Sequence, residues 1–195
     1  MLSTIEIAYS KAHEDAAGAG PHAGYAAELL ELTRVLAELL PDEPEVLWLC
    51  AIIRDAEARR PARLNDYGAM VPLSEQDPML WRRRLIADGE YCLQRAAALD
   101  PAGPRALQAA IHTAWCSRKS LAEPPLWTVV LRLYDALLML RDDPVVRVNR
   151  RLPWPRLPAQ RRHWMRSTRW TAICSRRFHL SRRAGRSIVS DATLR

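Results

Sequence analysis

Apolar side chains recur every three or four positions along most of the chain up to about residue 150. In the clearest stretch they step by four, three, four and three positions, at Tyr25, Leu29, Leu32, Leu36 and Leu39. This spacing is typical of an amphipathic helix that buries one face. The same pattern predicts further helices over residues 2–17, 44–61, 78–99, 104–116, 126–140 and from 144 onward. The chain is therefore predicted to be all-α.

One kind of corner between helices occurs three times. In each case a helix ends on leucine, an acidic turn follows and a proline opens the next helix, at residues 40–44, 99–104 and 140–144. Proline suits the first turn of a helix because its missing N–H would be unpaired there. Acidic side chains are favoured at the same end by the helix dipole. The repetition predicts antiparallel helix pairs that stack on one another.

One long connection, residues 64–77, is predicted to be non-helical. It begins with turn residues at 65–68 and leaves room for a short hairpin. Loops of this length in compact domains tend to carry function or to be disordered. The charged run 55–63 before it predicts a helix that ends in solvent near Pro61. After it, Asp77 is predicted to cap a helix whose first residue is Pro78.

The charge is divided unevenly between two parts of the chain. Residues 151–195 hold twelve arginines and one acid, Asp191, which gives +11; since the whole chain carries +7, residues 1–150 carry −4. We therefore predict a helical domain over residues 1–150 and a basic tail, rich in Arg, Trp and Pro, over residues 151–195. The tail lacks a periodic apolar face and is expected to be irregular or disordered.

The tail also has the features of a shifted reading frame. The shifted frame takes the third base of one codon together with the first two bases of the next. Because Trp is encoded by TGG, Met by ATG and Pro by codons that begin with CC, Trp154-Pro155 then gives GCC, alanine, and Trp164-Met165 gives GAT, aspartate. With GC-rich codons, the shifted reading continues as an alanine-rich, acidic sequence that suits another helix. We expect the tail to be a frameshift product. An alternative is that its alternating arginine and tryptophan bind nucleic acid.

The sequence contains no motif of an enzyme or a cofactor site. A nucleophile elbow, a P-loop and GxGxxG are absent. His112 and Cys116 have a spacing that can bind metal, but no second ligand pair accompanies them, so a buried histidine is the preferred interpretation. Helix capping and helix-end charge explain four further acidic residues better than paired catalytic carboxylates do; they are Asp55, Glu57, Glu75 and Asp77. We expect no enzymatic activity, no cofactor and no metal.

Cysteine usage and hydropathy predict a cytoplasmic protein. The four cysteines show no CxxC spacing, and three of them, Cys50, Cys92 and Cys116, fall on apolar helix faces, where a free thiol acts as a small hydrophobe. The longest apolar run, residues 46–53, is too short to span a membrane. The N-terminus has no signal-peptide pattern.

The side chains that could bind a protein partner are mostly tryptophans. In helical repeats such tryptophans usually pack in the core, but some line a concave groove. Arginines 82–84, beside the long connection, are either a solvated rim or a docking surface for an acidic helix, and the solvated rim is the preferred interpretation. The candidate protein-binding residues are Asp77, Trp81, Arg82, Trp115 and Trp127.

Five phrases in order resemble one known family. They are LLPDEPEVL (39–47), EARRPARL (57–64), MVPLSEQDPMLWRRRLIADGE (70–90), LQAAIHTAWC (107–116) and LYDALLMLRDDPVVRVNR (133–150). Together they are similar to the C-terminal helical extension of bacterial extracytoplasmic-function sigma factors of the sigma-70 family, over residues 5–150. The resemblance implies a tetratricopeptide-like array. In these sigma factors, domains upstream of the extension read the promoter and bind polymerase. Those domains do not align with this chain, so the resemblance assigns none of their functional residues to it.

The resemblance implies a function in transcription. We expect a regulatory, protein-binding domain whose partners are the sigma-factor core or RNA polymerase, and which meets DNA only through them. We also expect a fragment without sigma activity of its own, such as the second half of a split gene. The alternative is a stand-alone tetratricopeptide-like adaptor that binds a peptide or a helix.

Overall fold

The computed structural model describes residues 1–15, 24–100 and 102–151, and in these ranges it contains α-helices, two short 3-10 helices and no strand. The all-α prediction is confirmed. The chain divides after Arg147 into two units, the first of which is residues 1–147. The α-helices are α1 (Leu2–Asp15), α2 (Tyr25–Leu39), α3 (Pro44–Ala58), α4 (Arg83–Leu99), α5 (Pro104–Cys116), α6 (Trp127–Leu140) and α7 (Pro144–Arg151), of which α7 crosses the boundary.

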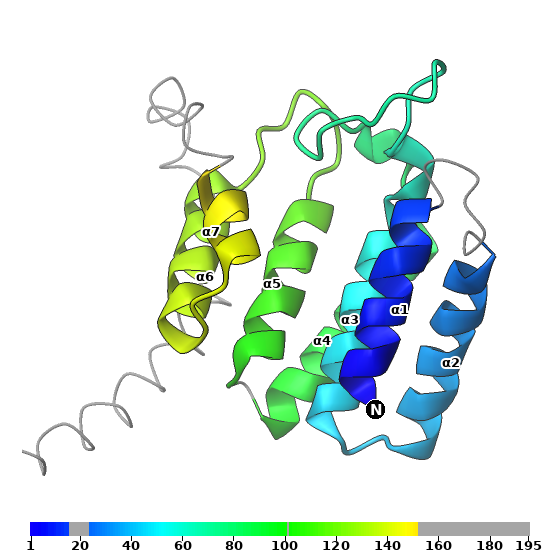
Figure 1. The fold of residues 1–195 in the computed structure, drawn as a ribbon, viewed down its shortest axis with the longest axis vertical. Helices are drawn as coiled ribbons and strands as arrows, with labels where there is room; N and C mark the ends of the chain where they lie inside the picture. The colour runs from blue at the N-terminus through cyan, green and yellow to red at the C-terminus, as the bar shows by residue number, and fades with distance from the viewer. Residues whose placement is uncertain (16–23, 101, 152–195) are drawn as a thin grey trace, which may run out of the picture. The chain divides into compact units, whose positions relative to one another are not determined.

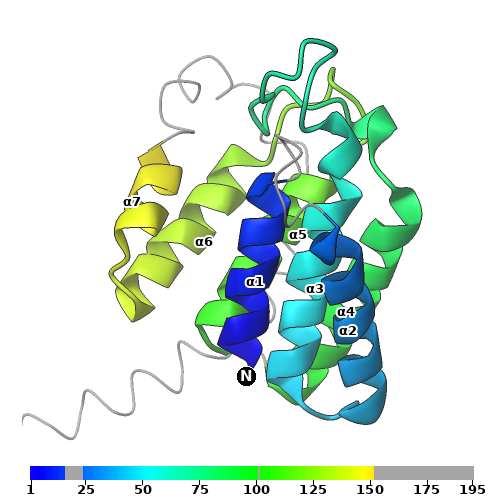
Figure 2. The same ribbon diagram turned by 45° about the vertical axis from the view of Figure 1, so that its right-hand side comes forward.

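Helix α3 lies at the centre of the unit. It packs against α1, α2, α4 and α5, as Figures 1 and 2 show from two directions, and successive helices run in opposite directions. Its residues from Val46 to Ala58 are all buried. An all-round apolar surface explains this burial as far as Ile53. Beyond Ile53 the helix carries charged side chains, which must find partners inside the protein.

The three predicted corners are confirmed. Helix α2 ends at Leu39 and α3 begins at Pro44, α4 ends at Leu99 and α5 begins at Pro104, and α6 ends at Leu140 and α7 begins at Pro144. The tetratricopeptide-like stacking remains a prediction.

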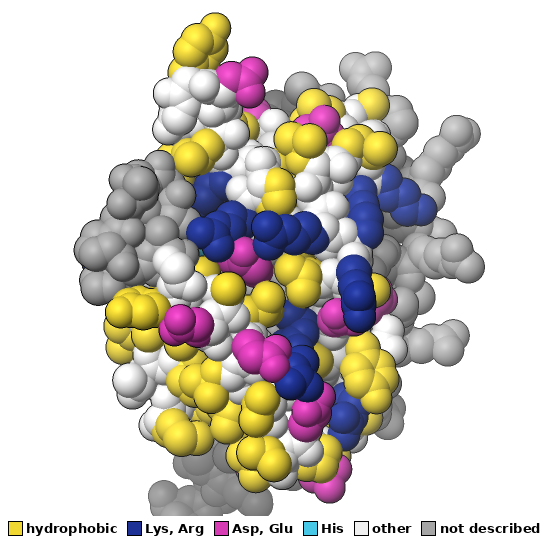
Figure 3. Space-filling model, turned by 90° about the vertical axis from the view of Figure 1, so that its right-hand side faces the viewer, with side chains coloured by type: hydrophobic (Ala, Val, Ile, Leu, Met, Phe, Trp, Pro, Cys, Tyr) yellow, Lys and Arg dark blue, Asp and Glu magenta, His cyan; other side chains and the backbone are white. Residues whose placement is uncertain are grey.

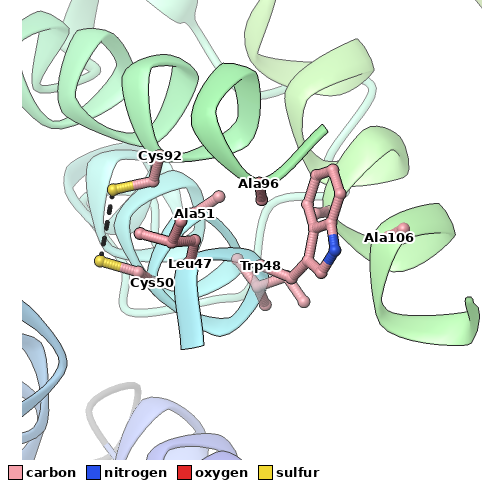
Figure 4. Close-up of a cluster of buried hydrophobic side chains, with 9 residues drawn as sticks. Leu47, Trp48, Cys50, Ala51, Cys92, Ala96 and Ala106 are labelled. Carbon is pink, nitrogen blue, oxygen red and sulfur yellow. Dashed lines mark hydrogen bonds between the residues drawn. The ribbon is translucent and has the colours of Figure 1, made fainter. Parts of the chain in front are cut away.

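A core of small side chains joins α3 to α4 and α5. The indole of Trp48 lies between Ala96 of α4 and Ala106 of α5 (Figure 4). The Cys92 thiol donates to the Cys50 Sγ at 3.4 Å, and the Cys50 thiol donates to the Thr33 carbonyl at 3.6 Å. Both cysteines are free and buried, as predicted. Alanine and cysteine let the helices approach closely enough to enclose the tryptophan.

The apolar stripe of α2 is only partly buried, which differs from the prediction. Tyr25, Leu32 and Leu39 are 51%, 42% and 71% exposed, whereas the fully buried side chains of α2 are Ala26 and Thr33. The small Ala26 permits close packing. The Thr33 hydroxyl is satisfied within the helix, because it donates to the Leu30 carbonyl at 2.8 Å. The side of α2 that carries small residues therefore faces the core, and part of the leucine stripe faces outward.

The helix predicted to start at Pro78 starts at Arg83 instead. Asp77 does cap, accepting from the Met79 N–H at 2.9 Å, but the element that it caps is a 3-10 helix, η2 (Pro78–Leu80). Trp81 and Arg82 are extended, and the Arg82 N–H donates to the Ala58 carbonyl at 2.9 Å. The last carbonyls of a helix lack partners within it. The break before α4 thus supplies a hydrogen-bond donor to a carbonyl in the last turn of α3.

The long connection is ordered by hydrogen bonds of its own. A second 3-10 helix, η1 (Arg60–Ala62), leads to an isolated bridge between Leu64 and Met70. Within the bridge, Asn65 Oδ1 accepts from the backbone of Tyr67 and Ala69, and Gly68 takes a left-handed φ of 73°. The short hairpin for which the sequence leaves room is thus a single tight turn closed by this bridge. The irregular tail, its shifted frame and its nucleic-acid binding concern residues 152–195, which lie outside the described residues.

Candidate functional site: charged side chains buried along α3

The charged residues at the end of α3 lie in the core, not in solvent as predicted. Arg54, Asp55 and Glu57 are 7%, 0% and 2% exposed. We call these three residues the buried charges. Burying a charge is unfavourable unless it is paired and hydrogen-bonded. Arg54 Nη1 donates to the Cys50 carbonyl within α3 at 3.5 Å, whereas the partners of Asp55 and Glu57 come from four other segments of the chain.

Glu57 connects α1, α3 and the segment before α4. Its Oε2 accepts from the Tyr9 hydroxyl at 3.2 Å, and its Oε1 accepts from Arg60 at 3.1 Å and from Arg82 at 3.0 Å. Burial and the Glu57 charge raise the pKa of Tyr9 far above its usual range, so the hydroxyl stays a donor. Glu57 is therefore a structural carboxylate shared by three donors, and not a helix cap.

Asp55 connects α3 to α5 and meets α4. Its Oδ2 accepts from the Thr113 hydroxyl at 2.8 Å, while its Oδ1 has no hydrogen-bond partner in the described structure. A Cβ at Gly89 would lie 3.0 Å from that Oδ1, so glycine permits α4 to approach here. Burial raises the pKa of Asp55 to about 6, against the opposing effect of Arg59. The carboxyl group changes charge near neutral pH, with one oxygen unpaired.

Arg59 occupies the position between His112 and Cys116. Its Nη2 lies 3.1 Å from His112 Nδ1, and its Nη1 donates to the His112 carbonyl at 3.3 Å and the Cys116 Sγ at 3.4 Å. Burial lowers the pKa of His112, and Arg59 lowers it further. Because arginine only donates, Nδ1 is the acceptor of a neutral imidazole. The two residues of the candidate metal spacing hold a guanidinium group instead.

A pocket of about 340 Å³ lies beside the buried charges, between the end of α1, α3 and the long connection. Its lining combines polar groups from His13, Arg59, Arg63 and Gln76 with apolar side chains from Ala56 and from residues 70–73. Burial and three arginines lower the pKa of His13 to about 3, so its ring is neutral at pH 7. Gln76 Nε2 donates to the Val71 carbonyl at 3.1 Å, which fixes the orientation of the amide. The pocket can bind a small polar group, but it places no nucleophile beside a base.

Two arginines join the long connection to the loop between α5 and α6. The guanidinium group of Arg118, 2% exposed, donates to the carbonyls of Ser74, Leu121 and Glu123. Arg83 donates to the carbonyls of Pro78, Arg118 and Lys119. Carbonyls in loops need such donors once they are buried. The long connection is therefore part of the folded scaffold.

The five candidate protein-binding residues do not form one surface. Trp81, Trp115 and Trp127 are 3%, 7% and 5% exposed, and the rings of Trp115 and Trp127 meet edge to face at 5.1 Å. Asp77 accepts from the backbone of η2, and Arg82 donates to Glu57. Their role in binding a partner remains a prediction. The structure brings Arg82 to the buried charges, which sequence patterns alone did not indicate.

Two further features bear on candidate sites. In the part of the chain that the structure describes, no three His, Cys, Asp or Glu side chains converge as a metal site. No helix among the described residues is long and apolar enough to cross a membrane.

Just under half of the chain matches a family of unknown function. Residues 1–97 match the model of that family, DUF6596, a range that includes Tyr9, Glu57 and Arg82. The uncharacterized protein R00370 of Rhizobium meliloti (strain 1021) is 37% identical over 123 residues, which are 63% of this chain and 29% of that protein. Since 123 residues are 29% of it, R00370 is about 420 residues long, and the match spans less than a third of its length. No solved structure matches the chain.

Proposed function

We propose that the chain is a regulatory, protein-binding domain of an extracytoplasmic-function sigma factor. It acts by contact with the sigma-factor core or with RNA polymerase. The observation that carries the proposal is the set of five phrases in family order. They fall on segments that make the contacts described above: the start of α3, the segment with Glu57, the end of the long connection together with Arg82 before α4, the face of α5 with Thr113, and the corner from α6 to α7.

Two features of the molecule support an interaction domain. The charges that α3 buries serve packing, and among the described residues no paired acid and base faces the 340 Å³ pocket. In addition, a similar segment forms less than a third of the longer protein R00370, as is expected of an appended domain. A helical scaffold appended to other domains commonly serves to bind proteins.

Affinity capture from the bacterium that carries this gene tests the proposal. Tagged chain is bound to resin, nuclease and 0.3 M salt remove contacts made through nucleic acid, and the RNA polymerase and sigma subunits are quantified by mass spectrometry. We expect enrichment of at least tenfold over the tag alone. Recovery of these subunits at the level of the tag alone would count against the proposal and favour the stand-alone adaptor, provided that another protein is enriched in stoichiometric amount.

A further inference from the structure

Three apolar side chains of α2 are one heptad apart and point outward. Tyr25, Leu32 and Leu39 are separated by seven residues each and are 51%, 42% and 71% exposed. Leu29 and Leu36, which complete the stripe, are half-buried. A seam that alternates steps of three and four is the pattern by which one helix packs along another. Where the structure describes this unit, α1 and α3 pack against α2 along one edge of that seam.

The open edge of the stripe borders a groove between α1 and α2. The groove has a volume of about 600 Å³ and is mainly apolar. Its lining residues are Ala8, Lys11, Tyr25, Glu28, Leu29 and Leu32. Among the described residues, the small Ala8 on α1 leaves the stripe open on this side. Grooves of this form typically receive the apolar face of an amphipathic helix.

Helix α2 is acidic, whereas α1 contributes Lys11 to the lining of the groove. Helix α2 exposes Glu28, Glu31 and Glu38 against a single arginine, Arg34, and the following corner adds exposed acids. Arg34 is already engaged, since its Nε donates to both Glu31 oxygens at 2.9 Å and its Nη1 donates to Glu38. Figure 3 looks at the molecule from the side on which α2 lies in Figure 1, and shows hydrophobic areas among side chains of both charges. The net charge of α2, one cation and three anions, is −2.

We propose that the α1–α2 groove docks a basic amphipathic helix from a partner protein. The apolar residues of that helix, spaced by three and four, would cover Tyr25, Leu32 and Leu39. Its lysines and arginines would lie against Glu28 and the other acids of α2. A second copy of this chain fits less well, because an α2–α2 contact would place the same acidic side chains against each other. This inference does not depend on the partner being a sigma factor or RNA polymerase.

Two synthetic peptides of 18 residues serve as probes. Both carry leucine at the seam positions of a heptad; the basic peptide has Lys and Arg at the flanking positions, and the acidic peptide has Glu there. Each is labelled with a dye, and its binding to the full chain is followed by fluorescence anisotropy. We expect saturable binding of the basic peptide, at least tenfold tighter than that of the acidic peptide, and weakening at 0.5 M salt because exposed charges are screened.

Variants locate the binding to the groove. Leu32→Gln together with Leu39→Gln should weaken binding of the basic peptide at least tenfold. Met139→Gln on α6, where the side chain is 86% exposed, is the matched control and should leave binding unchanged. Glu28→Lys should reduce the preference for the basic over the acidic peptide at least threefold. Circular dichroism must show that all variants melt like the parent chain, as is expected for exposed positions.

The proposal is overturned by any of three results. The first is absence of saturable binding of the basic peptide, including the case in which a second copy or the chain's own basic tail fills the groove. Light scattering that shows a dimer disrupted by Leu32→Gln would identify the second copy. The others are equal binding of the two peptides and binding that survives the double α2 variant.

Discussion

Replacement of Glu57 by glutamine should destabilise the fold far more than the same change on the surface. Glu57 is 2% exposed and accepts hydrogen bonds from Tyr9, Arg60 and Arg82. Glutamine has the same shape but no charge, and its amide group places a donor where the carboxylate accepts. At least one of the three donors then loses its acceptor in the core.

The magnitude follows from the burial of each partner. The contact between Tyr9 and Glu57 is fully inside the protein, and a hydrogen bond to a charged group there is worth about 1.5–3 kcal/mol. The side chains of Arg60 and Arg82 are 28% and 51% exposed, so water replaces much of what they lose, and each contributes less than about 1 kcal/mol. The sum is about 2–4 kcal/mol. For a domain of this size it corresponds to a fall in Tm of roughly 5–15 °C.

Urea unfolding followed by circular dichroism at pH 7 measures the effect, and Glu31→Gln is the matched control. Glu31 also bonds an arginine, Arg34, but their side chains are 60% and 46% exposed, so the control should keep the midpoint of the parent chain. Tyr9→Phe, alone and combined with Glu57→Gln, should show an effect smaller in the double variant than the sum of the singles. A Glu57→Gln midpoint equal to that of Glu31→Gln would refute the argument that buried charges hold α1, α3 and α4 together.

Three further predictions concern the same region. The pKa of Asp55 is raised to about 6, so the native carboxyl binds its proton more tightly than the unfolded one, and the contribution of Asp55 to stability falls as pH rises from about 4 to 6. Between pH 4 and pH 7, the free energy of unfolding of the Asp55→Asn variant, measured in urea, should therefore rise relative to that of the parent by up to about 3 kcal/mol. A difference between the two free energies that is constant with pH would contradict this. The pKa of His13 is lowered to about 3, so the unfolded state takes up the proton first as pH falls below 6.5, and the contribution of His13 to stability falls with it, opposite in sign to that of Asp55. His13→Gln should lose less over the same range, and equal acid sensitivity of the two chains would show that His13 is not responsible. Gly89→Val should lower stability by about 1–3 kcal/mol through its clash with Asp55, whereas Ala98→Val at an exposed position of α4 should have a much smaller effect; similar losses would mean that Gly89 is not needed for close packing.

The helices and their corners follow from local sequence because the signals that set them are local. Apolar spacing and the Leu–acid–Pro corners predict the ends at Leu39, Leu99 and Leu140 and the starts at Pro44, Pro104 and Pro144. The stripe of α2 predicts a helix in the same way. It cannot indicate which edge the neighbours cover, since that depends on the small residues Ala26 and Thr33.

The buried charges could not be predicted because their partners are distant in sequence. Thr113 lies 58 residues from Asp55, and Tyr9 lies 48 residues from Glu57. In isolation, a run of charged residues at a helix end is typically solvated, and only the contacts from α1, α4 and α5 change this. The start of α4 was misplaced for a similar reason: the Arg82 N–H bonds the Ala58 carbonyl, and local capping at Asp77 gives no sign of that contact. One signal was available, since Gly89 inside a helix indicates close approach of a neighbour.

The proposed function of this chain is binding of the transcription machinery. Its most direct test uses purified components: the chain is immobilised, and RNA polymerase core enzyme and sigma factor from the same bacterium are passed over it in biolayer interferometry with 0.3 M salt and no nucleic acid. We predict saturable binding of at least one of the two, with the Glu57→Gln variant, partly unfolded by warming, binding less than the parent at the same temperature. Absence of saturable binding to both proteins by the fully folded chain would contradict the account.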